Sequence, residues 1–208
     1  MLRRAVTKRL GARAIIDIRV GDLRGVPDAV IEGYVDDHSR AVLAALCREA
    51  GARTFFEIGT SRGRTAWTVA RNNPECHVYT LDLPAGAAEW DIGEAYHGMP
   101  EEGRITTLHG DSASFDFSPY AGRMDLVFVD GAHPDADVSN DTEWAFELLA
   151  AGGTIAWDGH PAVPGVYRRL NELARTLDRP LYHVRGTGLV IYTQADVVVP
   201  AGRRARGL

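Results

Sequence analysis

Short apolar runs alternate along this chain with stretches of helical periodicity. The runs are apolar on consecutive residues rather than on every second one, and they are rich in β-branched and aromatic residues, which is typical of strands buried on both faces. Strands that alternate with helices predict an α/β fold with a mostly parallel sheet and helices on both faces. The last two runs are separated only by 185–188, which predicts a closing hairpin and an antiparallel last strand. The expected strands are 54–58, 77–81, 105–108, 125–129, 154–157, 181–184 and 189–193.

Helical patterns fill the intervals between these runs. Pro27 and Asp28 are typical of a helix start and Gly51 of a helix end, so we expect one long helix over 27–50. This helix is a candidate for contact with a substrate or for pairing with a second copy in a homodimer. The other expected helices are 62–72, 135–150 and 163–177.

No internal repeat and no long linker divides the chain, so one main domain is expected. We place this domain at 53–193, with a helical extension over 1–52 packed on it and a basic tail over 194–208. The connection 84–103 is longer than a passive connection usually is. We interpret it either as a lid that faces a substrate or as a surface loop with a short helix of its own.

The charge balance limits the partners. The chain has 208 residues, is 45% hydrophobic and carries a net charge of −5, yet its two ends, 1–13 and 201–208, are basic and contain no acid. The remainder is therefore more acidic still and repels phosphate backbones, so we expect no nucleic-acid partner. No run approaches the roughly 18 apolar residues of a membrane span, and no signal-peptide core is seen, so we expect a cytoplasmic protein. The two cysteines lie in no metal or redox motif and are expected to be buried thiols.

A glycine-rich turn follows the first central strand. In an open parallel sheet, ligands bind beyond the carboxyl ends of the strands, where the strand order reverses. The first central strand ends in Glu57, Gly59 and Gly63, and the E-x-G-x-x-x-G spacing differs from the dinucleotide pattern G-x-G-x-x-G. Gly59 allows a tight turn and close backbone approach, and the following helix offers free N–H groups. Glu57 suits an ammonium group better than a pyrophosphate.

Carboxylates also end the next two strands. Asp82 closes the second central strand, and a carboxylate there can accept both hydrogen bonds of a ribose diol. Asp111 closes the third, where it is either a partner for an adenine amino group or the N-cap of a helix. Together with the glycine turn, these acids predict a nucleoside cofactor at this edge of the sheet.

Two further acids and two histidines follow the fourth and fifth strands. Asp130 and His133 come after one, and Asp158 and His160 after the other. If the two strands are neighbours, Asp130 and Asp158 emerge side by side. Three interpretations remain open: a divalent metal site, a general base with the group that orients it, or charged loop residues in solvent. A metal site would be formed by Asp130, Asp158 and His160, with Mg²⁺ or Mn²⁺ as the candidate ion.

These motifs in this order resemble the class I S-adenosylmethionine-dependent methyltransferases. The resemblance extends over about 53–193, and it is strongest to a small bacterial branch with the turn F-E-I-G-T-x-x-G-x-T and the strand end V-F-V-D-G-x-H. It implies a Rossmann-like seven-stranded sheet with a reversed last strand, and methyl transfer from S-adenosylmethionine to a small molecule, most often at a hydroxyl oxygen. The nearer branch places His-Asp-Tyr after the fifth strand, whereas this chain has Asp158, Gly159 and His160 there.

The resemblance also implies roles for individual residues. Glu57, Gly59 and Thr60 would hold the methionine part, Asp82 the ribose, and Asp111 with Ser112 the adenine, while Gly63 would shape the turn. The full set of implied cofactor-binding residues is Glu57, Gly59, Thr60, Ser61, Gly63, Asp82, Leu83, Asp111, Ser112 and Asp130.

Methyl transfer from a sulfonium is an in-line displacement, so positioning supplies much of the rate and a base completes it. His133 is the first candidate for the base and His160 the second, with Asp130 beside the reacting centre. Two other functions stay open. One is an NAD(P)-dependent oxidoreductase, which shares the acidic end of the second strand. The other is a non-catalytic domain that binds S-adenosylmethionine.

Overall fold

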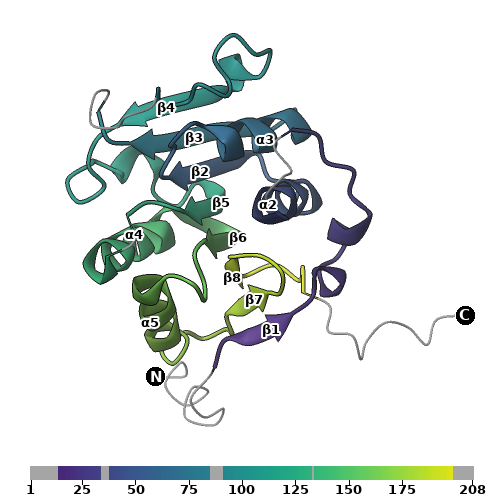
Figure 1. Cartoon of the computed structure of the whole chain (residues 1–208), viewed down its shortest axis with the longest axis vertical. Coiled ribbons are helices and arrows are strands. Elements are labelled where there is room, and N and C mark those ends of the chain that lie inside the picture. The colour runs from purple at the N-terminus through teal and green to yellow at the C-terminus, as the bar shows by residue number, and fades with distance from the viewer. Residues whose placement is uncertain (1–13, 34–37, 85–90, 133, 199–208) are drawn as a thin grey trace, which may run out of the picture.

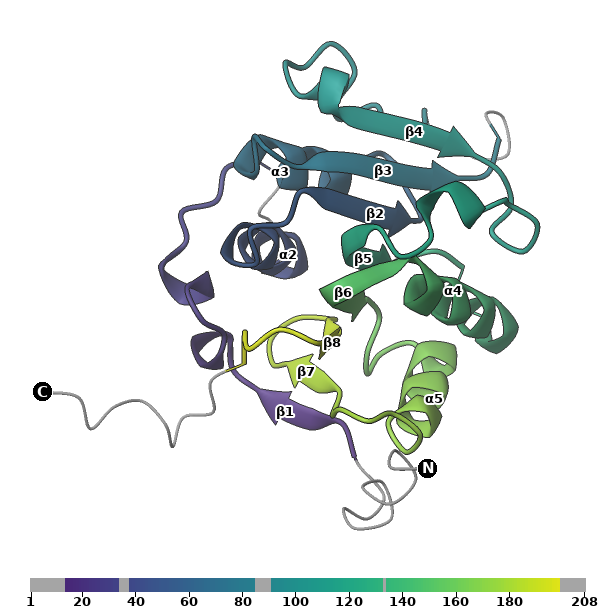
Figure 2. The same ribbon diagram turned by 180° about the vertical axis from the view of Figure 1, so that it is seen from behind.

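One eight-stranded sheet organises the computed structural model, which describes residues 14–33, 38–84, 91–132 and 134–198 (Figures 1 and 2). The strand order is β1-β7-β8-β6-β5-β2-β3-β4. β8 runs antiparallel to both of its neighbours, and all other neighbouring strands are parallel. The strands are β1 (Ile16–Ile18), β2 (Thr54–Ile58), β3 (His77–Asp82), β4 (Ile105–His109), β5 (Met124–Val129), β6 (Leu149–Trp157), β7 (Tyr182–Val184) and β8 (Val190–Thr193).

The predicted α/β, Rossmann-like class is confirmed, and so is the reversed last strand. The predicted number of strands is wrong by one, because β1 adds an eighth strand beside β7. Ile16 pairs with Tyr182 and Ile18 with Val184, and the Asp17 carboxylate lies 2.9 Å from Nδ1 of His183. The three residues of β1 are too few to show a strand pattern, and only Ile18 is buried.

The strand order reverses between β2 and β5. After β2 the chain adds β3 and β4 outward on one side, then returns to place β5 on the other side of β2. The carboxyl ends of these four strands therefore meet around one crevice, which is the ordinary ligand position of an open parallel sheet.

Helices cover both faces of the sheet (Figure 1). Two neighbouring residues of β2 face opposite sides of the sheet: Phe55 packs into the core under α2 and α3, while Phe56 packs into the core under α4 and α5. Burial on both faces requires apolar residues at consecutive positions. The helices are α2 (His38–Glu49), α3 (Arg64–Asn72), α4 (Asp135–Leu148) and α5 (Pro164–Leu173), with 3-10 helices at Val20–Asp22, Val26–Asp28, Glu102–Arg104 and Ser118–Tyr120.

The long helix predicted over 27–50 is wrong in its first part. Pro27 belongs to a 3-10 helix, residues 29–33 are not helical, and α2 is described from His38 onward. The side chain of Asn72 on α3 accepts a hydrogen bond from the backbone N–H of Glu32 at 2.9 Å and donates to its carbonyl at 2.7 Å. These contacts satisfy backbone groups that a helix would otherwise have paired.

Three further predictions concern the cysteines, the two ends of the chain and membrane-spanning helices. The predicted buried thiols are confirmed: Cys47 and Cys76 are free, buried and separated by 3.7 Å between their sulfur atoms. Both basic ends, 1–13 and 201–208, lie outside the described residues. Within the described ranges, none of the helices has the length and apolar character needed to cross a membrane.

Candidate functional site

A cavity of about 400 Å³ opens at the carboxyl ends of β2 to β5. We call it the larger cavity. Four turns and the first half of α4 form its walls, so residues far apart in the sequence meet there. Its lining residues that the sequence singled out are Gly59, Ser61, Asp82, Leu83, Asp111, Ser112 and Asp130.

The turn after β2 is held against the end of β5. Gly59 has φ +103°, and a Cβ at this position would lie 2.2 Å from the backbone oxygen of Asp130. The Gly59 N–H donates to the carbonyl of Leu81 at 2.8 Å, which fixes the turn on the β3 side as well. Only glycine fits both the backbone angle and the close approach, as the sequence predicted.

Asp82 lies between this turn and the larger cavity. Its Oδ2 accepts a hydrogen bond from the backbone N–H of Ser61 at 2.6 Å, and its Oδ1 accepts one from the N–H of Leu83 at 2.8 Å. Ser61 has φ +49°, an uncommon angle for a residue with a side chain. Each carboxylate oxygen has a lone pair left, so Asp82 is a fixed acceptor that can receive two further donors from a ligand.

A second cavity of about 170 Å³ lies on the α3 side of the same turn. We call it the smaller cavity. It shares Gly59, Ser61 and Asp130 with the larger cavity, so the two adjoin at these residues. Its lining residues are Arg40, Glu57, Gly59, Thr60, Ser61, Arg62, Arg64, Thr65 and Asp130.

Glu57 forms the buried floor of the smaller cavity. It is 1% exposed, and its Oε2 accepts a hydrogen bond from the Thr80 hydroxyl at 2.5 Å. The Thr80 oxygen lies 2.7 Å from the Thr60 oxygen, which continues the chain of hydrogen bonds to the turn. Burial raises the pKa of Glu57 well above its ordinary value, against the lowering effect of the Thr80 hydrogen bond.

This raised pKa predicts a stability that depends on pH. Because folded Glu57 holds its proton to higher pH than unfolded Glu57, the folded state loses stability as pH rises above about 4.3, by up to about 1.4 kcal/mol per pH unit. The loss should continue until pH reaches the raised pKa of folded Glu57. Over this pH range, we expect the free energy of unfolding in urea to fall for wild type relative to Glu57→Gln. Glu75→Gln, at an exposed carboxylate, is the matched control and should follow wild type. Parallel curves for wild type and Glu57→Gln would contradict the prediction.

The far end of the larger cavity contains an acid that the sequence analysis missed. Asp141 on α4 is 1% exposed and receives a hydrogen bond from Asn140 Nδ2 at 3.1 Å. Burial raises its pKa, while hydrogen bonding from the Ser112 side chain opposes that rise. The i, i+4 pair Asp137 and Asp141 was the available signal, since both acids face this cavity from one side of the helix.

Asp111 lines the same end of the larger cavity, but it does not cap a helix. Its Oδ1 accepts a hydrogen bond from the N–H of Ala113 at 2.9 Å, and its carbonyl accepts from Ser114 and Phe115. The residues after it form a turn. Asp111 therefore stabilises a turn, and its second oxygen has no part in that hydrogen bond.

The segment 91–104 packs against the glycine turn. The N–H of Gly93 donates to the carbonyl of Ser61 at 3.0 Å, and the N–H of Ala95 donates to that of Arg62 at 2.9 Å. Tyr96 is 1% exposed and lies against Gly63, whose added Cβ would meet the Tyr96 ring at 2.4 Å. This part of the predicted insertion is thus packed on the glycine turn and ends in a short 3-10 helix, Glu102–Arg104, while residues 85–90 lie outside the described residues.

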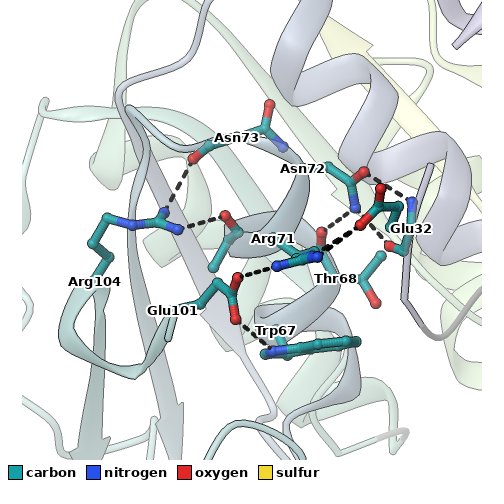
Figure 3. Close-up of polar contacts among 9 residues, drawn as sticks. Glu32, Trp67, Thr68, Arg71, Asn72, Asn73, Glu101 and Arg104 are labelled. Atoms are coloured by element: carbon teal, nitrogen blue, oxygen red, sulfur yellow. Dashed lines mark hydrogen bonds and ion pairs between the residues drawn. The ribbon is translucent and has the colours of Figure 1, made fainter. Parts of the chain in front are cut away.

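One polar network joins the segment before α2 and the segment 91–104 to α3 (Figure 3). Arg71 contacts Glu32 from the segment before α2 at 2.9 Å and Glu101 from the segment 91–104 at 3.0 Å. The other oxygen of Glu101 accepts a hydrogen bond from Trp67 Nε1 at 3.0 Å. Since α3 begins at the glycine turn, these contacts hold both segments against the helix that starts there.

The ends of β5 and β6 are neighbours, which was the condition for Asp130 and Asp158 to emerge side by side. Val129 pairs with Trp157, and the N–H of Asp158 donates to the carbonyl of Val129 at 3.1 Å. Asp130 lines both cavities, whereas Asp158 and His160 line neither. His160 instead stacks on Tyr167, with a ring distance of 5.4 Å.

The predicted metal set is therefore not assembled. Burial lowers the pKa of His160, and the charge of His183 lowers it further. Within the described residues no three His, Cys, Asp or Glu side chains form a group that could hold a metal ion. His133 lies outside the described residues. Because the three residues of the predicted set do not form such a group in the described part of the chain, we derive no step through a divalent cation.

Comparison with known proteins decides the family. A family model described as a methyltransferase domain matches residues 56–159, which include the glycine turn, Asp82, Asp111, Asp130 and Asp158. The chain belongs to the methyltransferase domain family. The match begins inside β2 and ends just after β6, so it contains every strand end that lines the larger cavity.

Solved structures share the fold of this methyltransferase. One is the O-methyltransferase TomG from Streptomyces achromogenes, involved in tomaymycin synthesis and solved with S-adenosylmethionine; it is 19% identical, with a TM-score of 0.59, and the match covers 95% of this chain and 96% of that one. Another is the O-methyltransferase from Bacillus cereus in complex with S-adenosylhomocysteine, 20% identical, with a TM-score of 0.58 and coverage of 91% and 94%. A search of curated protein sequences found no match.

Proposed function

We propose that this methyltransferase transfers the methyl group of S-adenosylmethionine to a hydroxyl oxygen of a small molecule. The observation that carries the proposal is the pair of adjoining cavities around Gly59, with the fixed acceptor Asp82 in one and charged groups of both signs in the other. A nucleoside with a zwitterionic tail matches this division. The O-methyltransferases of known structure that share the fold support the choice of oxygen.

The residues present fit this cofactor at three points. Asp82 has lone pairs for the two ribose hydroxyls, Asp111 and Ser112 line the end expected to hold the adenine, and the turn through Gly59 lets a ligand approach the backbone closely. When bound, S-adenosylmethionine supplies an electrophilic methyl group on a sulfonium. Asp130 lines both cavities, so it lies where the adenosyl and amino-acid ends of such a ligand would meet.

The chain's own contribution to the reaction is to hold the acceptor in line and to remove its proton. We assign the base to His133, which follows Asp130 by three residues in the sequence. Asp130 would orient the acceptor or the base. His160 is the weaker candidate for the base, because its ring lies between Tyr167 and His183 rather than along either cavity.

The base assignment predicts a large loss of turnover. We expect His133→Gln to lower kcat about 100-fold while S-adenosylhomocysteine binds as in wild type, because proton removal contributes to the rate and not to cofactor affinity. His77→Gln, at the opposite end of the sheet, is the matched control and should keep wild-type turnover. If His160→Gln loses turnover and His133→Gln does not, the assignment is wrong.

The proposed function is tested with S-adenosylmethionine labelled in its methyl group and a panel of phenols, catechols, carboxylic acids and amines. Labelled product and S-adenosylhomocysteine should form together, and only with hydroxyl acceptors. Transfer to amines alone would correct the acceptor atom. Binding of S-adenosylhomocysteine without turnover on the whole panel would favour the non-catalytic alternative. The family match leaves no observation that favours an NAD(P)-dependent oxidoreductase.

A further inference from the structure

A third cavity, of about 340 Å³, lies at the amino ends of β2 and β3 and is lined by both cysteines of the chain. We call it the cysteine cavity. It shares no lining residue with the larger or the smaller cavity, which lie at the opposite ends of these strands. Its lining residues are Cys47, Arg48, Gly51, Ala52, Arg53, Asn72, Asn73, Pro74, Glu75 and Cys76.

The two thiols of this cavity are free and close together. Their sulfur atoms are 3.7 Å apart, and the S–H of Cys47 donates to the sulfur of Cys76. A disulfide bond is about 2.05 Å long, so the two sulfurs must approach each other by about 1.7 Å, which small rotations of the side chains can supply. Both side chains are buried from bulk solvent, and the cysteine cavity beside them gives a small oxidant a route to the sulfurs.

Hydrogen bonds fix the backbone that carries each thiol. The N–H of Cys76 donates to the carbonyl of Asn73 at 2.9 Å, and Arg104 donates to the carbonyls of both residues at 3.2 Å (Figure 3). The buried side chain of Asn73 donates to the carbonyl of Ala44 on α2 at 3.2 Å, which attaches the turn before β3 to that helix. Cys47 lies three residues further along the same helix. The fold itself therefore holds the two sulfurs near each other.

We propose that Cys47 and Cys76 are an oxidation site, at which hydrogen peroxide converts the two thiols of the folded protein into a reversible disulfide that ties α2 to the start of β3. One sulfur attacks a peroxide oxygen, the O–O bond breaks, and a sulfenic acid and one water are formed. The other sulfur attacks the sulfenic sulfur, the S–S bond forms, and a second water leaves. Two thiols are thereby oxidised to one disulfide, and one hydrogen peroxide is reduced to two waters.

The disulfide joins the part of the chain before the family match to the matched domain. α2 ends before residue 56, where the match begins, whereas Cys76 lies inside it. The bond links residues 29 positions apart, so it restricts the unfolded chain and stabilises the folded one. We expect the midpoint of thermal unfolding to rise by about 5 °C or more on oxidation. The hydrogen bond with Cys76, together with burial, raises the pKa of Cys47, so its reactive thiolate is scarce and the oxidation is slow.

Mass spectrometry of the folded wild-type protein, before and after hours of incubation with hydrogen peroxide, tests the proposal. Each sample is then unfolded in urea and treated with iodoacetamide, which labels every free thiol. The reduced chain should take a label on each of its two cysteines. The oxidised chain should take none, be two hydrogens lighter and stay monomeric in non-reducing electrophoresis, and dithiothreitol should restore both labels. Cys47→Ala and Cys76→Ala are the matched controls, which should show neither the loss of two hydrogens nor the higher midpoint of unfolding.

The wild-type samples alone can overturn the proposal. Two labels after incubation, sulfinic or sulfonic acids in place of the disulfide, or a disulfide between two chains would each do so. A disulfide that forms in urea but not in the folded protein, or one that forms without raising the midpoint, would overturn it too. Because neither cysteine lines the larger or the smaller cavity, such a failure would leave the proposed function standing, and binding of S-adenosylhomocysteine by the reduced protein tests that function separately.

Discussion

Replacing Asp82 with alanine will weaken binding of S-adenosylhomocysteine by about 100-fold or more. The expected loss combines two charge-assisted hydrogen bonds to the ribose with the release of the Ser61 and Leu83 N–H groups, which Asp82 now holds at 2.6 and 2.8 Å. Both the lost ribose contacts and the freed N–H groups change the lining of the larger cavity. Titration calorimetry measures the affinity, and thermal unfolding of the same samples shows whether the variant is folded.

The matched control for Asp82 lies at the other end of the same strand. Glu75 precedes β3, is exposed and pairs with Arg53. Glu75→Ala should bind S-adenosylhomocysteine as wild type does. Asp82→Asn should fall between the two variants, because an amide retains one acceptor oxygen. Wild-type affinity in folded Asp82→Ala would remove Asp82 from the site and would weaken the proposed function with it.

The second large effect is expected at Gly59. Gly59→Ala places a methyl group 2.2 Å from the backbone oxygen of Asp130 at φ +103°, so the turn after β2 must move away from the end of β5. We expect the midpoint of thermal unfolding to fall by at least about 5 °C, from backbone strain alone and before the clash is counted. S-adenosylhomocysteine should bind at least about tenfold more weakly, because Ser61 and Asp130 lose their relative positions.

Gly51→Ala separates strain from clash. Gly51 also has a positive φ, +60°, but a Cβ there would meet nothing within 4 Å. This control should lose some stability and no affinity for the ligand. If Gly59→Ala behaved like Gly51→Ala in both measurements, the close approach between the turn and β5 would have no functional importance.

Local patterns in the sequence were sufficient for most of the fold. The seven central and C-terminal strands could be predicted from runs of consecutive apolar residues, because a strand buried on both faces needs apolar side chains on both. β1 could not be found in this way, because three residues carry no period and its partner β7 lies far away in the sequence. The start of the helix over 27–50 failed for a related reason: Asn72, forty residues away from Glu32, provides the hydrogen bonds that a helix would have made internally.

Residues of the candidate site could likewise be predicted where a local pattern marks them, and not where distant packing places them. Gly59, Asp82 and Asp111 were predictable because each directly follows a strand, and strand ends converge in a parallel sheet. Asp141 and Arg40 reach the cavities from helices, and only the packing of those helices on the sheet shows which of their side chains face inward. His160 follows a strand too, yet it lies against Tyr167 and His183, beside the turn where Gly159 takes φ +92°.

The pairing of β1 with β7 has a consequence for how the chain reaches this structure. The two strands join residues up to 166 positions apart, and β8, which separates β7 from β6, is nearer still to the C-terminus. During synthesis β1 therefore emerges first but waits for almost the whole chain before it has a partner. Non-local pairings of this kind slow folding, so the half of the sheet from β6 to β1 should assemble last, after the strands that line the larger cavity.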